Sequence, residues 1–406
     1  MKVRRHGAAA LLAAASLTVA ACGGERQNDA VPADASPHGY VEGAEETAEA
    51  QSRLVVADAD TGAVRVVDLI TGQVHPAGRV DGVRNIAGDG RFGYLTGAGD
   101  SVHVIDSGSW TVDHGDHVHY YRAPVREVGV APGRTPLGVH SDPVVTAVSF
   151  PDGTTSLLDR AQLDAGSVVE TAKILREPHP STAVPYGEHV LASVADPGHR
   201  HARGVRVHDR RGKPVAEIAQ PCPDLQGQAV TRRGVVFGCA DGALLVTEKD
   251  SVFAGEKIPY PRGVSEQERA TRFTHRPGGT TLAAAAGDDA VWLLDVGRRA
   301  WSHLETGPVT AVNAVGEGAP VLALARDGVL RAFDIATGRE QAQTRLLPPE
   351  ATGGAAAPTI QVDTTRAYVN NPASGEVYEI DYNDNLRVAR TLTVEGKASY
   401  VVETGR

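Results

Sequence analysis

Short runs of apolar residues alternate with polar positions along most of this chain, and turns rich in glycine and aspartate separate the runs. One unit reads Val55-Val56-Ala57-Asp58, then a turn at Asp60-Thr61-Gly62, then Val64-Arg65-Val66-Val67-Asp68. Alternation with a period of two is typical of half-buried strands, and Asp-Gly or Thr-Gly pairs favour tight turns. The pattern therefore predicts a chain built from β-hairpins.

The same unit recurs along the chain. A clear copy reads Leu322-Ala323-Leu324-Ala325, Arg326-Asp327-Gly328 and Leu330-Arg331-Ala332-Phe333-Asp334. Further copies begin near Tyr94, Val145, Val190, Val235, Leu282 and Ala367. A repeat of about 45 residues made of short strands is typical of a β-propeller. We predict an all-β fold, a β-propeller of eight blades; seven blades is the alternative if one short unit is an insertion.

The two ends of the repeat region predict how the ring closes. Internal units have an extra strand before the strand pair, as at residues 309–314, whereas the unit at Leu54 has none. Residues 398–402 form a strand with no unit after it. We expect this C-terminal strand to be the innermost strand of the first blade, because closure removes the open sheet edge.

The N-terminus predicts export. Lys2, Arg4 and Arg5 precede an apolar run at residues 7–21, which is too short for a stable membrane span. The small residues before Cys22 resemble a bacterial lipobox, which implies cleavage before Cys22 and lipid attachment to it. An ordinary signal peptide with a chance cysteine is the alternative.

Three regions follow from this. Residues 1–21 are predicted to be a lipoprotein signal peptide. Residues 22–50 contain almost no large apolar side chains, so they are predicted to be a lipidated flexible tether. Residues 51–406 are predicted to be the propeller. The expected location is extracytoplasmic, with the lipid anchored to the outer face of the cell membrane.

Charge and cysteine content limit the partners. The formal net charge is −10 and the sequence has no long basic stripe, which argues against a nucleic-acid partner.

Cys222 and Cys239 would face an oxidising space, so a disulfide between them is expected; a metal role is the alternative. We expect a monomer.

The most informative cluster is Asp113-His114-Gly115-Asp116-His117-Val118-His119-Tyr120-Tyr121. Imidazole is the commonest zinc ligand, and carboxylates complete the shell or orient a ligating ring. In an extended segment His117 and His119 face the same side and could grip one ion. We predict a zinc site that includes His117 and His119, with His114 and Asp116 beside them. A polar loop with solvated histidines is the alternative.

Two further histidines are candidate ligands. His140 lies in the approach to the strand pair of the third unit, and His179 precedes the inner strand of the fourth unit. The His cluster follows the outer strands of the second unit, so these residues from adjacent blades could converge near the propeller axis.

The sequence is similar to the AztD family of zinc metallochaperones. The similarity is carried by residues 42–46, residues 50–54, the His cluster and Gly234-Val235-Val236-Phe237-Gly238-Cys239. The resemblance implies an extracytoplasmic propeller that binds Zn²⁺ and hands it to the solute-binding protein of an ABC zinc importer. On this resemblance His117 and His119 carry over as ligands, then Asp116, and then His140 and His179.

Two positions depart from the family pattern. Gln226 stands where family members often have a histidine after the Cys-Pro motif, and His38 alone represents a mobile His-x-His tract near the N-terminus. A zinc-dependent, lactonase-like hydrolase is one rival function, and an interaction scaffold without metal is the other. No His-Glu-x-x-His or nucleophile-elbow motif occurs, so we predict that the protein is not an enzyme.

Overall fold

The computed structural model describes residues 39–99, 101–114, 116–133, 136–353 and 356–406. The predicted signal peptide, Cys22 and His38 lie outside the described residues. Residues 39–406 form one unit of antiparallel β-sheets. Its helical elements are α1 (Arg160–Asp164), η1 (Glu266–Glu268) and η2 (Pro349–Thr352). Within the described ranges, no helix has the length and apolar character that a membrane crossing requires.

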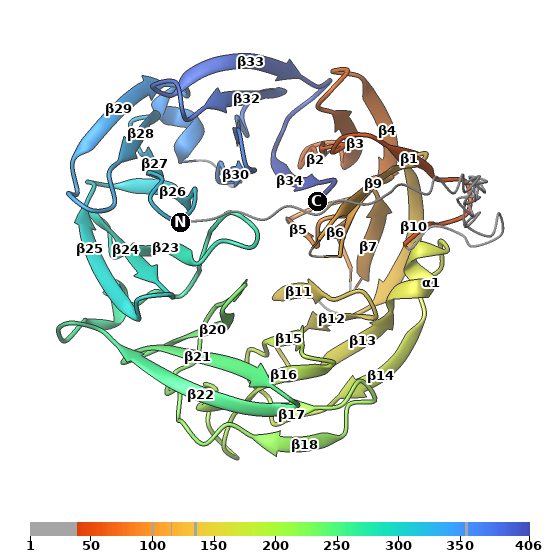
Figure 1. Cartoon of the computed structure of the whole chain (residues 1–406). Helices are drawn as coiled ribbons and strands as arrows, with labels where there is room; N and C mark the ends of the chain where they lie inside the picture. The colour runs from red at the N-terminus through yellow and green to blue at the C-terminus, as the bar shows by residue number, and fades with distance from the viewer. Residues whose placement is uncertain (1–38, 100, 115, 134–135, 354–355) are drawn as a thin grey trace, which may run out of the picture. The chain divides into compact units, whose positions relative to one another are not determined.

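The sheets follow one another along the chain and around a ring (Figure 1). From the innermost strand outward, the first four are β34–β2–β3–β4 (Tyr400–Thr404, Arg53–Ala57, Ala63–Asp68, Val74–Arg79), β5–β6–β7–β10 (Asn85–Gly88, Phe92–Thr96, Ser101–Asp106, Arg126–Pro132), β11–β12–β13–β14 (Gly138–Ser141, Val145–Ser149, Thr155–Asp159, Glu170–Ile174) and β15–β16–β17–β18 (Ala183–Tyr186, His189–Val194, Gly204–His208, Pro214–Glu217).

The remaining sheets of the ring are β19–β20–β21–β22 (Gln228–Thr231, Gly234–Cys239, Gly242–Lys249, Val252–Pro259), β23–β24–β25 (Thr281–Ala286, Ala290–Asp295, Ala300–Glu305), β26–β27–β28–β29 (Val309–Ala314, Val321–Ala325, Val329–Phe333, Glu340–Arg345) and β30–β31–β32–β33 (Ile360–Val362, Ala367–Asn370, Glu376–Asp381, Arg387–Thr393). In the three-stranded sheet, Thr274 forms a bridge to Ala283 on the inner side. The predicted all-β propeller architecture is confirmed.

The turns repeat as regularly as the strands. The Asp68 side chain accepts hydrogen bonds from the main-chain N–H groups of Ile70 and Thr71, at 3.0 and 2.8 Å. Asp334 does the same for the main chain of the turn that follows β28. Gly72 has φ of +74°, which a residue without Cβ adopts without strain. The Asp-x-x-Thr-Gly turns of the sequence repeat are therefore side-chain-capped reversals between strands.

The core lies between the sheets. Val55 of the first sheet packs in one cluster with Leu95 of the second, and Leu191 packs in another with Phe237 of the following sheet. Burial of these faces removes apolar surface from water at about 25 cal/mol per Å². Another cluster contains Leu54 and Tyr368, so the last sheet packs against the first.

The C-terminal strand completes the first sheet. Strand β34 pairs antiparallel with β2, with Arg53 opposite Thr404 and Val55 opposite Val402. The predicted closure of the ring by the C-terminal strand is thus confirmed. The predicted disulfide is also present, between Cys222 and Cys239, whose Cα atoms are 5.0 Å apart.

A hairpin interrupts the second sheet. Strands β8 (Ser109–Asp113) and β9 (Val118–Arg122) lie between β7 and β10 in the chain and form a separate small sheet with β1 (Glu45–Thr47). In Figure 1, β1 and β9 lie beside the second sheet at the side of the ring. The His cluster, predicted to follow the outer strands of the second unit, therefore lies on a hairpin inserted before the outermost strand, β10.

The tether predicted for residues 22–50 is corrected at its C-terminal end. Glu45, Glu46 and Thr47 pair with Arg122, Tyr121 and Tyr120 of β9. The indole N–H of Trp110 also donates to the carbonyl oxygen of Gly39, at 3.1 Å. Apolar side chains are not needed at this place, because three kinds of contact hold the segment: the backbone hydrogen bonds at the sheet edge, the ion pair of Glu45 with Arg122 and the hydrogen bond of Glu46 with His119.

Candidate metal centre

The hairpin places its histidines at an exposed tip. Asp113 is directly opposite Val118 in the register, so the turn between them carries His114 and His117. The main-chain N–H of His114 donates to the carbonyl oxygen of His117, at 3.0 Å, and closes this turn. At the other end, Trp110 and Tyr121 are buried and anchor the hairpin. The hairpin thus has a buried, apolar base and an exposed, polar tip.

Three imidazole rings meet at the tip. The ring centroids of His114 and His117 are 4.8 Å apart, those of His117 and His119 are 4.9 Å apart, and those of His114 and His119 are 5.3 Å apart. One nitrogen atom of each ring lies within 4.8 Å of those of the other two. The prediction that His117 and His119 face the same side agrees with this arrangement, and His114 joins them across the turn.

These residues fit a zinc ion in chemistry and in spacing. Zinc takes imidazole nitrogens at 2.0–2.1 Å in a tetrahedral shell, which places two ligand nitrogens about 3.4 Å apart. The ligand nitrogens lie within 4.8 Å of one another, so the rings would have to rotate to reach this spacing. Such rotation is open to the ring of His117, because its side chain is 56% exposed. Three imidazoles leave a fourth position for water or for a ligand from another molecule.

Two carboxylates orient two of the rings. The Nδ1–H of His117 donates to Asp116 at 2.8 Å, and the Nδ1–H of His119 donates to Glu46 at 2.7 Å. A carboxylate that accepts from Nδ1 keeps the proton there, so Nε2 is the nitrogen that coordinates an ion. In this geometry Asp116 would orient the ring of His117 and would not itself bind an ion. The sequence prediction placed Asp116 among the metal residues and did not find Glu46, which precedes His119 by 73 residues.

The structure does not bring His140 and His179 to the tip. Within the described part of the chain, the group of possible ligands contains His114, His117 and His119. His179 is buried, and its two ring nitrogens lie 2.6 Å from the carbonyl oxygen of Glu177 and 3.0 Å from the hydroxyl of Ser193. A ligand role for His140 or His179 stays a prediction.

His140 faces a cavity of about 420 Å³ that is lined by segments of several successive sheets. The Nε2–H group of Gln228 donates to its Nε2 at 2.6 Å. Burial lowers the pKa of His140 to about 4, so the ring is neutral at physiological pH. Gln226, the position that departs from the family pattern, lines the same cavity. The presence of Gln226 in place of a histidine thus changes the surroundings of His140 and not those of the hairpin tip.

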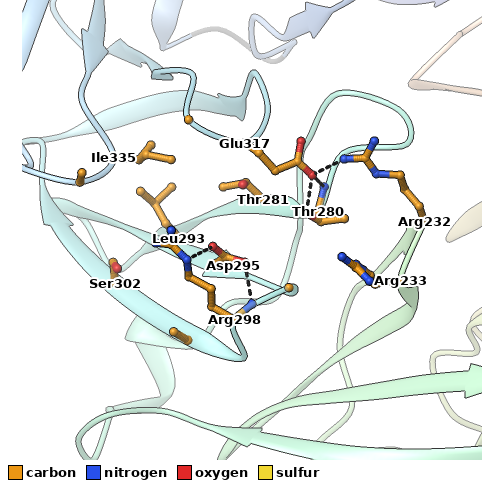
Figure 2. Close-up of a pocket in the computed structure, with 14 residues that line it drawn as sticks. Arg232, Arg233, Thr280, Thr281, Leu293, Asp295, Arg298, Ser302, Glu317 and Ile335 are labelled. Carbon is orange, nitrogen blue, oxygen red and sulfur yellow. Dashed lines mark hydrogen bonds and ion pairs between the residues drawn. The ribbon is translucent and has the colours of Figure 1, made fainter. Parts of the chain in front are cut away.

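A larger cavity of about 780 Å³ is lined by strand and turn residues of the β19–β22, β23–β25 and β26–β29 sheets (Figure 2). Glu317 accepts hydrogen bonds from the main-chain N–H of Thr280, at 2.9 Å, and from Arg232, at 2.7 Å. Burial alone would raise the pKa of Glu317, but the hydrogen bonds from Thr280 and Arg232 bring it down to about 2. None of the residues predicted as metal ligands lines this cavity. The size of this cavity is therefore no evidence about the function of the predicted metal residues.

Comparisons with known proteins agree with the sequence resemblance. No protein-family model matches the chain. The zinc chaperone AztD of Citrobacter koseri is 25% identical over 371 residues, which cover 87% of this chain and 86% of the relative. The crystal structure of Citrobacter koseri AztD superposes with a TM-score of 0.75 at 22% identity, covering 88% of this chain and 98% of that one. The Dos1 propeller has a TM-score of 0.53 at 11% identity, covering 80% and 91%. The sequence and the fold together confirm the resemblance of this chain to the AztD family.

Proposed function

We propose that this protein is a zinc chaperone that carries Zn²⁺ outside the cytoplasm and passes it to the solute-binding protein of an ABC zinc importer. The observation that carries the proposal is the meeting of His114, His117 and His119 at an exposed hairpin tip. The name of the Citrobacter koseri relative, a zinc chaperone, supports the same function. Zinc is the cargo here and takes part in no reaction on the protein.

The tip has the properties that a carrier needs. Three imidazoles bind zinc tightly. The carboxylates of Asp116 and Glu46, at the Nδ1 atoms of His117 and His119, increase the basicity of the other nitrogen in each ring. His114 and His117 are exposed, so a ligand from a recipient protein could complete the zinc shell before a histidine leaves. Zinc then moves by exchange of one ligand at a time, and the ion is never released into water.

Location and attachment complete the proposal. Cleavage before Cys22 and lipid on that residue would hold residues 51–406 at the outer face of the cell membrane, next to an importer. A monomer with an open hairpin tip would leave the site accessible to a single recipient. The disulfide between Cys222 and Cys239 is in keeping with an oxidising compartment.

Stopped-flow transfer tests the proposal. The zinc-loaded protein is mixed with the solute-binding protein of a zinc importer from the same organism, at several recipient concentrations, and separately with a strong chelator. Direct exchange predicts a transfer rate that rises with recipient concentration and exceeds the chelator-driven loss. If transfer never exceeds that loss, zinc only dissociates passively, and the protein is a zinc store or a zinc-stabilised scaffold.

A further inference from the structure

The short strand β1 lies next to the proposed zinc site and rests on the edge of the small sheet. It contains three residues and pairs with β9, while its own outer edge carries no further strand in the described structure. The side chain of Glu46 is 44% exposed. A short, exposed edge strand opens locally at a low free-energy cost, because few buried contacts hold it.

The two oriented histidines differ in where their carboxylates come from. Asp116 is the chain neighbour of His117, so this pair stays together whatever the rest of the chain does. Glu46 reaches His119 from another segment, across the pairing of β1 with β9. When β1 leaves β9, His119 loses its hydrogen-bond acceptor and His117 keeps its own.

We infer that Glu46 is a positioning residue for His119, and that the pairing of β1 with β9 sets how tightly the hairpin holds zinc. This inference rests on the proposed function. With β1 paired, the Glu46 carboxylate fixes the proton of His119 on Nδ1 and aims Nε2 at the ion. With β1 displaced, the ring rotates and both tautomers are populated, so the third ligand is weakened. A recipient that displaces β1 from β9 thereby loosens one ligand of three and speeds the handover.

The neighbouring residue provides a matched control. The carboxylate of Glu45 pairs with Arg122 at 2.9 Å and belongs to the same strand, and its side chain is also exposed. Glu46→Gln should lower zinc affinity about ten- to a hundredfold, the usual effect of losing a carboxylate that orients a metal-bound histidine. Glu45→Gln should change zinc affinity by about twofold or less, because an exposed ion pair contributes little. Affinity is measured by competition with a fluorescent zinc chelator, and thermal unfolding checks that each variant folds.

Three measurements separate positioning by Glu46 and β1 from a general effect of charge. In a His119→Ala background, Glu46→Gln should have no further effect on zinc affinity, because its partner is gone. Nitrogen NMR of the apo protein should show His119 moving from the Nδ1–H tautomer to a mixture in Glu46→Gln. Deletion of residues 39–48, which removes β1, should weaken zinc binding at least as much as Glu46→Gln.

Equal affinities of Glu46→Gln and Glu45→Gln would overturn the inference, as would full affinity after deletion of β1. A further loss in the His119→Ala background would also overturn it, since Glu46 would then act on the ion and not through His119. These failures leave the proposed function standing if the wild type binds zinc through the hairpin. Unchanged zinc binding after removal of His117 and His119 would instead refute the proposed site itself.

Discussion

Trp110 and Tyr121 stack on each other across the His-bearing hairpin, with ring centroids 5.4 Å apart and planes inclined by 21°. The two residues are directly opposite in the pairing of β8 with β9. The guanidinium of Arg91 lies 3.7 Å from the Trp110 ring centroid and pairs with the buried Asp106 at 2.8 Å. A stacked pair under a cation gives the hairpin a rigid base, although its tip is exposed.

The first prediction concerns the ligands. Replacement of both His117 and His119 by alanine should abolish tight zinc binding, because one imidazole cannot replace three. The melting temperature of the apo protein should hardly change, since the tip is solvent-exposed and contributes little to the core. Equilibrium dialysis with metal analysis and calorimetry of the apo protein measure the two effects. Full-affinity zinc binding by the double variant would exclude the hairpin as the site.

The second prediction concerns the base of the hairpin. Trp110→Ala should weaken zinc binding without removing any ligand, because the loss of stacking lets the strands separate. It should also lower the free energy of unfolding, and a large aromatic-to-alanine change in a core typically costs about 3–5 kcal/mol. Trp301→Ala is the control, since Trp301 is similarly buried but packs in a core cluster that contains no residue of the hairpin. That variant should be destabilised and should still bind zinc normally while folded.

The third prediction concerns ring closure. Deletion of residues 396–406 removes β34, exposes the edge of β2 and takes Val401 and Val402 out of two interfaces between sheets. The truncated protein should unfold at a much lower temperature and should aggregate through the open edge. Circular dichroism melting and size-exclusion chromatography measure this. A truncated protein that melts cooperatively at the wild-type temperature would contradict closure.

The fourth prediction concerns pH. Glu403 of β34 is 1% exposed, and burial raises its pKa to about 7 even though Arg406 opposes the shift. A carboxyl whose folded-state pKa is raised is ionised more easily in the unfolded chain, so its contribution to stability is full below pH 4.5 and is lost as pH rises through 7. Glu403→Gln should therefore be more stable than the wild type at pH 8, by about 3 kcal/mol, with little difference at pH 4. Urea unfolding at several pH values tests this, and the exposed Glu395→Gln should show no such trend.

The fifth prediction concerns the disulfide. Cys222 and Cys239 are buried and bonded, with 17 residues of sequence separation. Thiol titration of the denatured, unreduced domain should find no free thiol from this pair. Replacing both by alanine should lower the free energy of unfolding by about 3 kcal/mol, chiefly because the unfolded chain gains freedom. An unchanged unfolding midpoint would show that the bond contributes nothing measurable.

The repeat, the turns and the closure could be predicted because each has a local signature in the sequence. Asp68 and Thr71 predict a side-chain-capped turn, and the alternation of apolar residues with a period of two predicts the strands on either side of it. The histidine cluster could be predicted for the same reason, since His114, His117 and His119 are close in the chain.

The pairing of β1 could not be predicted from local signatures. Glu45, Glu46 and Thr47 are polar and show no alternation, so nothing in this segment distinguishes a strand from a tether. The strand exists because β9 offers an edge, and because Arg122 and His119 in a distant segment offer an ion-pair partner and a hydrogen-bond partner to the two glutamates. The same limit applies to His140 and His179, whose directions depend on Gln228 and Ser193 in neighbouring strands.

The contact between Arg53 and Thr404 joins residues 351 positions apart. Synthesis and export proceed from the N-terminus, so β2 emerges early. It stays without its partner β34 until the strands of all the other sheets have emerged. Until then the β2 edge of the nascent chain has unpaired backbone N–H and C=O groups. A chain interrupted before β34 would keep that edge exposed, where chaperones and proteases can recognise it.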